Sequence, residues 1–166
     1  MCFLYYNLSG CDTMFRRKIT RELEEWKESL RRKKKALVIK GLRQVGKTTV
    51  VLDFGEANYK NIIYLNFLDN PSLKNIFSDD LNVDTLVKKM SIYFPCKNFE
   101  AFNTVKIYDE VQECSNARYS VKPFMLDGRF DIIETGSLLG FRGYNQSKVK
   151  IPTGFEHIIK MYAMDF

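Results

Sequence analysis

The sequence predicts an α/β domain with a mainly parallel sheet of about five strands flanked by helices. Short apolar runs of strand length alternate with segments of helical spacing along the 166 residues. The first such run, ALVIKG at 36–41, is almost continuously hydrophobic and ends in glycine, as is typical of a buried parallel strand. Hydrophobic residues make up 45% of the chain and aromatic residues 14%, which indicates a folded core rather than disorder.

The helices and strands can be placed in order from their periodicity. Before the first strand, Ile19, Leu23, Trp26 and Leu30 recur at helical spacing, which predicts one face of an amphipathic helix. Further strands are predicted at 61–69, 104–110, 129–137 and 157–166. Further helical patterns occupy 47–57, part of 71–94, and 117–127, where Pro123 restricts the helix.

The histidine and cysteine content excludes several kinds of site. His157 is the only histidine, so neither a histidine-based metal site nor a Ser-His-Asp triad is expected. The four cysteines, Cys2, Cys11, Cys96 and Cys114, fit no zinc-ligand spacing, which favours free thiols in a reducing cytoplasm. No apolar run approaches the roughly 20 residues that span a bilayer. A cytoplasmic protein is therefore predicted.

The positive charge of the chain is local. The formal net charge is +6, and residues 15–47 carry 13 lysines and arginines against four glutamates. Within this region Arg31–Lys35 reads RRKKK, which we interpret as a solvated helix end, with a nucleic-acid-binding patch as the alternative. Residues 1–13 differ in texture from the rest of the chain, so we expect a disordered lead before a single domain at 14–166.

A glycine-rich stretch between the first strand and the next helix predicts a phosphate-binding loop. It has the order G-x-x-x-x-G-K-T, in which glycines let the backbone wrap around phosphate oxygens and donate N–H groups to them. The following helix would add its N-terminal dipole. Lys47 would reach the β- and γ-phosphates, and the hydroxyl of Thr48 would bind Mg²⁺. The predicted nucleotide-binding residues are Gly41, Leu42, Arg43, Gln44, Val45, Gly46, Lys47, Thr48 and Thr49.

Two acids end the strand VKIYDE. Asp109 fits the carboxylate that holds Mg²⁺, together with Thr48, in nucleotide hydrolases. Glu110 is the next residue and is suited to act as the base that polarises an attacking water. A solvated turn would explain the same two acids alone, but the phosphate-binding loop favours the functional interpretation.

The strand that ends in IIETGS offers a third element of the same site. Its tip carries Thr135 and Ser137, either of which can contact a γ-phosphate or a water, and Thr135 is preferred. Ser137 is equally well interpreted as the N-cap of a helix.

Four stretches resemble one family: LVIKGLRQVGKTTVV, KIYDEVQEC, FDIIETGSLLGF and IPTGFEHIIKMYAMDF. They are similar to the bacterial and archaeal AAA-type P-loop ATPases that carry a C-terminal domain of unknown function. The resemblance runs from about Phe15 to Phe166 and includes the Walker A loop and the Walker B acids in order. Its ending, YAMDF, departs slightly from the more usual pattern of that family.

The resemblance implies a P-loop core in which an extra strand lies between the loop strand and the acid strand. It implies ATP and Mg²⁺ as ligands, with Gly41–Thr49 as the cradle, Asp109 and Glu110 as the acids, and Thr135 or Ser137 as a sensor. It also implies that the C-terminal domain is missing here, so that hydrolysis drives a missing second domain or a partner. Homo-oligomers are a further implication. No arginine finger is assigned; Arg118, Arg129 and Arg142 are better interpreted as structural or solvated, and Arg43 as facing phosphate or a neighbouring subunit.

The leading hypothesis is an Mg-dependent ATPase that acts as a conformational motor or switch, and several alternatives stay open. A GTPase would need an N/T-K-x-D motif, which the sequence lacks. A small-molecule kinase would normally need an arginine-rich lid. A regulatory module that binds ATP with little turnover and a DNA-associated ATPase are the other candidates.

Trp26 and Tyr64 are interpreted as packing residues rather than as platforms for base stacking.

Overall fold

The computed structural model describes residues 18–29, 35–137 and 153–162. The sequence predictions for residues 1–13, Arg31–Lys34 and Arg142 lie outside these ranges. Five parallel strands form one sheet in the order β2-β3-β4-β1-β5. The strands are β1 (Ala36–Gly41), β2 (Asn61–Asn66), β3 (Thr104–Asp109), β4 (Asp131–Ser137) and β5 (Glu156–Met161). The predicted α/β class and the mainly parallel sheet are confirmed.

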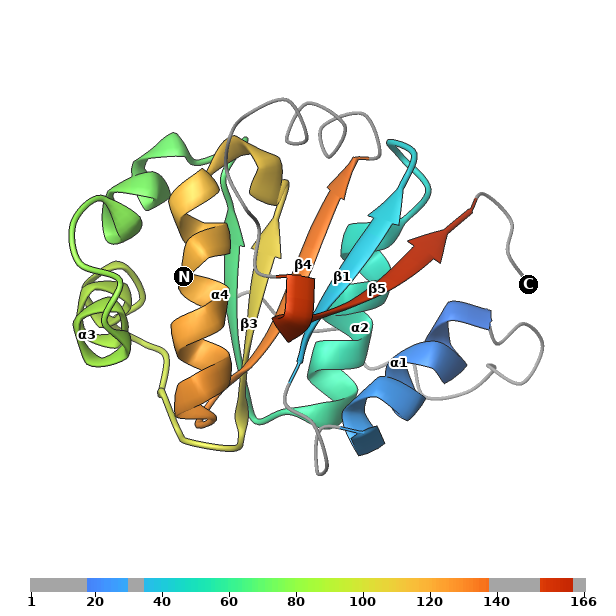
Figure 1. The fold of residues 1–166 in the computed structure, drawn as a ribbon, viewed down its shortest axis with the longest axis horizontal. Helices are drawn as coiled ribbons and strands as arrows, with labels where there is room; N and C mark the ends of the chain where they lie inside the picture. Colours follow the sequence, from blue (N-terminus) through green and yellow to red (C-terminus); the bar gives the residue numbers. More distant parts are fainter. Residues whose placement is uncertain (1–17, 30–34, 138–152, 163–166) are drawn as a thin grey trace.

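Helices cover both faces of the sheet (Figure 1). One face packs against α1 (Lys18–Ser29) and α2 (Lys47–Asn58), and the other against α3 (Val83–Tyr93) and α4 (Ser115–Asp127). Three short 3₁₀ helices complete the described chain: η1 (Pro71–Phe77), η2 (Val111–Glu113) and η3 (Thr153–Phe155). None of the helices in the described ranges is long and apolar enough to cross a membrane.

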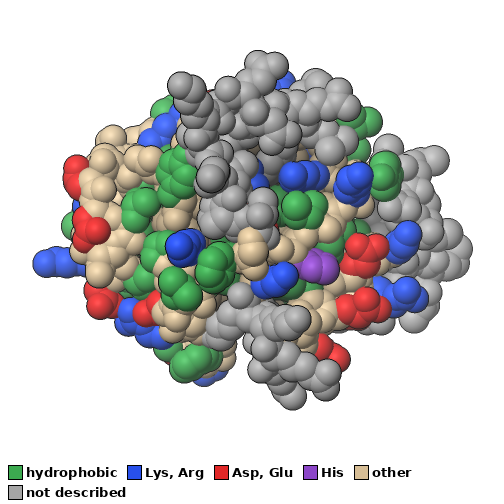
Figure 2. Space-filling view, in the orientation of Figure 1, with side chains coloured by type: hydrophobic (Ala, Val, Ile, Leu, Met, Phe, Trp, Pro, Cys, Tyr) green, Lys and Arg blue, Asp and Glu red, His purple; other side chains and the backbone are tan. Residues whose placement is uncertain are grey.

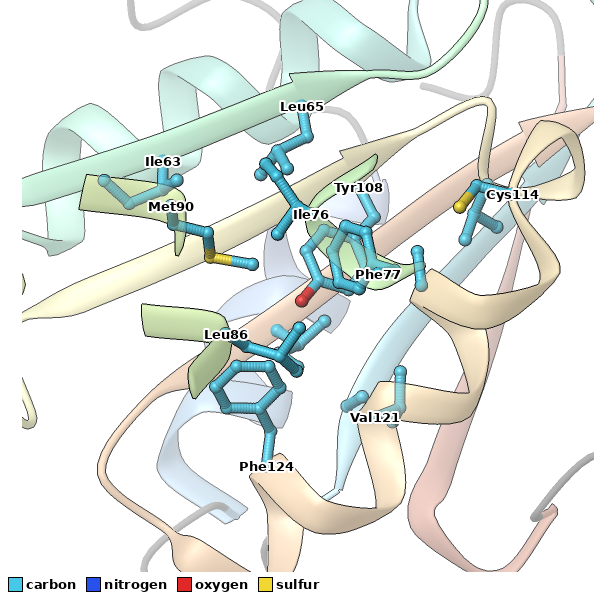
Figure 3. Packing of buried hydrophobic residues seen from close by; sticks show 14 of the residues in the cluster. Ile63, Leu65, Ile76, Phe77, Leu86, Met90, Tyr108, Cys114, Val121 and Phe124 are labelled. Atoms are coloured by element: carbon cyan, nitrogen blue, oxygen red, sulfur yellow. The ribbon is translucent and has the colours of Figure 1, made fainter. Parts of the chain in front are cut away.

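The core is split by the sheet into two clusters of apolar side chains. On the α1/α2 face, Ile19, Leu23 and Trp26 are buried, which confirms the predicted amphipathic helix. On the α3/α4 face, the rings of Phe77 and Tyr108 pack edge to face with 5.6 Å between their centroids. Figure 3 shows this pair at the centre of the second cluster. The strand order decides which loops meet at the edge of the sheet.

Two predicted boundaries change for local reasons. The strand predicted at 61–69 ends at Asn66, because the side-chain oxygen of Asn66 accepts the backbone N–H groups of Leu68 and Asp69, each at 3.0 Å. The helical pattern within 71–94 divides into η1 and α3, and the side chain of Asn82 caps α3 by accepting the N–H of Asp84 at 3.0 Å. Such hydrogen bonds from a side chain to the backbone end a strand or begin a helix at positions that the hydrophobic periodicity does not indicate.

The inserted strand is the feature of the topology that matters most for the site. β4 pairs with β1 on one side and with β3 on the other, so it lies between the strand that precedes the predicted loop and the strand that carries the predicted acids. This is the arrangement that the family resemblance implies. It brings the carboxyl ends of β1, β4 and β3 side by side.

Candidate functional site

The predicted site residues gather at the carboxyl edge of the sheet. The strands are parallel, so their carboxyl ends share one edge, and in open α/β sheets ligands bind at that edge (Figure 1). The loop from Leu42 to Gly46 links β1 to α2 there. Asp109 ends β3, and Thr135 lies near the end of β4. Residues distant in sequence therefore meet at one place.

The loop adopts backbone conformations that explain its two glycines differently. Gly46, the N-cap of α2, has a φ of 87°, in the left-handed region that favours glycine. Gln44 also lies in that region, at φ 63°. Gly41 is needed for space instead, since a Cβ on it would lie 2.6 Å from the carbonyl oxygen of Met161 in β5. Gly46 has no side chain that could cap the start of α2. The backbone N–H groups at the start of a helix without such a cap suit an anion.

Lys47 is buried at the base of this loop. Its Nζ donates hydrogen bonds to the carbonyl oxygens of Leu42 at 2.7 Å and of Gly41 at 3.3 Å. Burial lowers the pKa of Lys47 below its ordinary value, while the carboxylates of Glu110 and Asp109 act in the opposite direction. An anion placed in the loop would offer this ammonium group a charged partner in place of two carbonyls.

Asp109 is the centre of the hydrogen-bond network. It is 3% exposed, and its Oδ2 accepts the hydroxyls of Thr48 at 2.9 Å and Tyr64 at 2.6 Å. Its Oδ1 accepts the hydroxyl of Thr135 and the backbone N–H of Glu110, the latter at 3.1 Å. Among the described residues, four neutral groups donate hydrogen bonds to this carboxylate, and the Lys47 ammonium interacts with it electrostatically.

Glu110 follows directly and has an unusual backbone. Its φ is 50°, a left-handed conformation that is uncommon for residues other than glycine and is concentrated at functional sites. Its carboxylate accepts a hydrogen bond from the side-chain amide of Gln112. The backbone of Glu110 is therefore joined to Asp109, whereas its side chain is held by the turn of η2.

The predicted residues divide into those that meet and those that do not. Thr48, Asp109 and Thr135 are joined directly, and Lys47 lies beside them on the same loop and helix. Ser137 is buried and pairs in register with Gly41, so it flanks the loop. The remaining loop residues are wholly or partly exposed around this centre: Leu42, Arg43, Gln44, Val45 and Thr49.

Two arginines considered from the sequence have structural partners. Arg118 of α4 is buried and makes a bidentate ion pair with Glu156 of β5, with Nη2 and Oε2 2.9 Å apart. Arg129 pairs with Asp84 and Asp127. Arg43 is exposed on the loop. The structural interpretation of Arg118 and Arg129 agrees with these contacts.

One residue of the network was missed from the sequence. The sequence predicts Tyr64 to be a packing residue, and its ring does pack against the α1/α2 core, but its hydroxyl also contacts Asp109. The signal would have been a tyrosine near the end of a strand that neighbours the acid strand. That signal depends on strand order, which periodicity does not provide.

The fold and the loop together define a class: a P-loop nucleoside-triphosphatase core with a strand inserted between the loop strand and the acid strand. A family model described as an AAA domain matches residues 33–166. The chain therefore belongs to the AAA domain family. No curated protein sequence matches the chain.

Solved structures with the same fold include large AAA-type proteins. Caenorhabditis elegans PCH-2 aligns with a TM-score of 0.53 at 14% identity, covering 87% of this chain and 41% of that one. Drosophila ORC, solved bound to AT-rich DNA and Cdc6, aligns with a TM-score of 0.55 at 12% identity, covering 88% and 56%. Aeropyrum pernix ORC2, in ADPNP–ADP complexes, aligns with a TM-score of 0.51 at 14% identity, covering 95% and 50%. The chain spans about half the length of these proteins.

Proposed function

We propose that this chain binds ATP with Mg²⁺ and hydrolyses it, acting as a conformational motor or switch for a second domain or a partner. The observation that carries the proposal is the cluster formed by Thr48, Asp109 and Thr135 beside the buried Lys47. It joins the end of the acid strand, the tip of the inserted strand and the start of the helix after the loop. These are the parts that bind and orient a triphosphate in P-loop enzymes.

The donor set fits Mg²⁺. The Thr48 hydroxyl and the Asp109 carboxylate, whose oxygens lie 2.9 Å apart, would hold the ion, since Mg²⁺ is usually bound through one or two protein oxygens together with substrate phosphates and waters. When bound, the ion neutralises charge that develops on the phosphates. Thr48 can offer its oxygen to the ion and still donate its proton to Asp109. Lys47 would leave the two loop carbonyls and bind the β- and γ-phosphates.

Glu110 is the proposed general base, which would orient and deprotonate the attacking water. Its carboxylate accepts a hydrogen bond from the amide of Gln112 and also acts electrostatically on Lys47 at the base of the loop, which supports this role. Thr135 would sense the γ-phosphate through the hydroxyl that now contacts Asp109. Through these contacts Glu110 and Thr135 would couple the nucleotide state to η2 and β4.

The experiment is hydrolysis by a Glu110→Gln variant. We expect it to bind Mg–ATP as tightly as the wild type and to turn over about 100-fold or more slowly, because an amide cannot accept the proton of the water. Glu113→Gln is the matched control, since Glu113 lies three residues later on η2 and is exposed. Normal hydrolysis by the Glu110 variant would refute the base assignment. Tight binding without turnover by the wild type would favour the alternative, a regulatory module.

DNA is the alternative partner. The Arg31–Lys35 segment motivates it, and a structural neighbour was solved bound to AT-rich DNA. On the face drawn in Figure 2, the basic side chains of the described residues are interspersed with acidic ones rather than gathered into one patch. A DNA affinity that falls steeply with salt would support this candidate.

We further propose a cytoplasmic location. We also propose a homo-oligomer or a partner protein, which AAA-type ATPases commonly require.

A further inference from the structure

We propose that Tyr64 is a positioning residue, whose hydroxyl holds the Asp109 carboxylate in the orientation needed to bind the cation of a Mg–nucleotide. This inference rests on the proposed function. It adds a residue from β2, which contributes none of the loop, acid or sensor residues predicted from the sequence.

The geometry places Tyr64 on the side of Asp109 opposite Thr135. β2 pairs with β3 on the side away from β4, with Asn66 in register with Asp109. From β2 the Tyr64 hydroxyl reaches Oδ2 at 2.6 Å, while Thr135 reaches Oδ1 from β4 on the other side. The Asp109 carboxylate thus accepts hydrogen bonds from both strands that neighbour β3. Thr48, the predicted metal ligand, shares Oδ2 with Tyr64.

A second contact fixes the tyrosine hydroxyl in turn. The side-chain amide of Asn66 lies 3.3 Å from the Tyr64 oxygen and 2.8 Å from Oδ2 of Asp69. The oxygen of the same Asn66 side chain accepts two backbone N–H groups of the following turn. The turn after β2 therefore orients Tyr64, and Tyr64 orients Asp109.

The hydroxyl is suited to act as a permanent donor. A phenol keeps its proton throughout the physiological pH range, so the Tyr64 hydroxyl can donate its hydrogen bond to Asp109 at all times. A carboxylate held by short hydrogen bonds loses the freedom to rotate away from a ligand, which lowers the entropic cost of binding. A residue that only packs would need the ring and not the hydroxyl.

Tyr64→Phe separates these two roles because it keeps the ring. The matched control is Tyr59→Phe, which removes a tyrosine–aspartate hydrogen bond of 2.8 Å to Asp131, at the start of β4 and away from the site. For each variant, ATP binding is measured by calorimetry in EDTA and across a series of buffered free Mg²⁺ concentrations. ATP turnover is then measured across the same series.

We expect Tyr64→Phe to raise the half-saturating Mg²⁺ concentration about tenfold in both measurements, the effect of losing one hydrogen bond to a charged group. ATP binding in EDTA and turnover at saturating Mg²⁺ should stay within about twofold of the wild type. Tyr59→Phe should leave the Mg²⁺ dependence unchanged. An unchanged Mg²⁺ dependence in Tyr64→Phe would overturn the inference alone. Failure of the wild type to bind ATP more tightly with Mg²⁺ would overturn the proposed function as well.

Discussion

Two polar clusters lie on opposite faces of the same strand. Thr135 of β4 points to the α1/α2 face and contacts Asp109, while its neighbour Glu134 points to the α3/α4 face and faces Arg118. Successive residues of a strand alternate between faces, so the two clusters are separated by the thickness of the sheet. Each cluster contains a buried carboxylate, but the groups that surround the two carboxylates differ.

Among the described residues, the hydrogen bonds to Asp109 come from neutral donors, and Lys47 of the neighbouring loop interacts with it through charge alone. The cluster around Glu134 uses charge: Arg118 pairs with Glu156 and lies 3.9 Å from Glu134, so one guanidinium faces two carboxylates. Within the described residues, neither side-chain oxygen of Glu134 has a hydrogen-bond partner. Burial, and then the charge of Glu156, raises the pKa of Glu134 to about 8.

The difference indicates separate roles. Hydroxyl donors can reorient when a charged ligand arrives, so the Asp109 cluster can change partners at little cost. The Arg118 cluster joins α4, β4 and β5 through buried charges, and removing one member leaves the others uncompensated. We infer that the first cluster serves ligand binding and that the second serves the stability of the sheet edge.

Arg118→Met tests the second cluster most severely. It removes the cation that pairs with Glu156 and faces Glu134, and we expect it to lower the free energy of unfolding by about 3–5 kcal/mol at pH 8. Urea unfolding measures the loss, which should be smaller at pH 5, where Glu134 is protonated. Arg21→Met is the control, because Arg21 is exposed on α1 and should leave stability unchanged. Equal stabilities for wild type and Arg118→Met would mean that the ion cluster contributes nothing.

The Glu134→Gln variant tests the second cluster through the pH dependence of the folding stability. The pKa of Glu134 is higher in the folded than in the unfolded chain, so the folded state binds more protons between about pH 4.5 and 8. Wild-type stability should therefore fall as pH rises through this window and level off above it. The glutamine variant cannot ionise, so we expect it to match the wild type near pH 5 and to exceed it by up to about 4 kcal/mol at pH 9. Parallel stability curves for the two proteins would contradict this assignment.

Much of the site could be predicted because its residues lie at recognisable points of the sequence. The loop Gly41–Thr49 stands between a strand and a helix, and Asp109 and Thr135 end apolar runs. The contact between Thr48, Asp109 and Thr135 then follows from a parallel sheet whose carboxyl ends share one edge.

The missed features depend on tertiary neighbours. The role of Tyr64 requires that β2 lie beside β3, and the ion cluster requires that α4 cover β4 and β5. Periodicity predicts that a residue is buried but not what it faces. Gly41 shows the same limit, since its close approach to the Met161 carbonyl depends on the pairing of β1 with β5.

The central claim is that the loop and its lysine bind ATP, and calorimetry tests it most directly. ATP and GTP are titrated into the wild type and into Lys47→Ala, each with Mg²⁺. We predict tight binding of ATP by the wild type, weaker binding of GTP, and a loss of at least about 100-fold in ATP affinity for Lys47→Ala, because a buried cation no longer faces the phosphates. Equal ATP affinities for the two proteins would contradict the account.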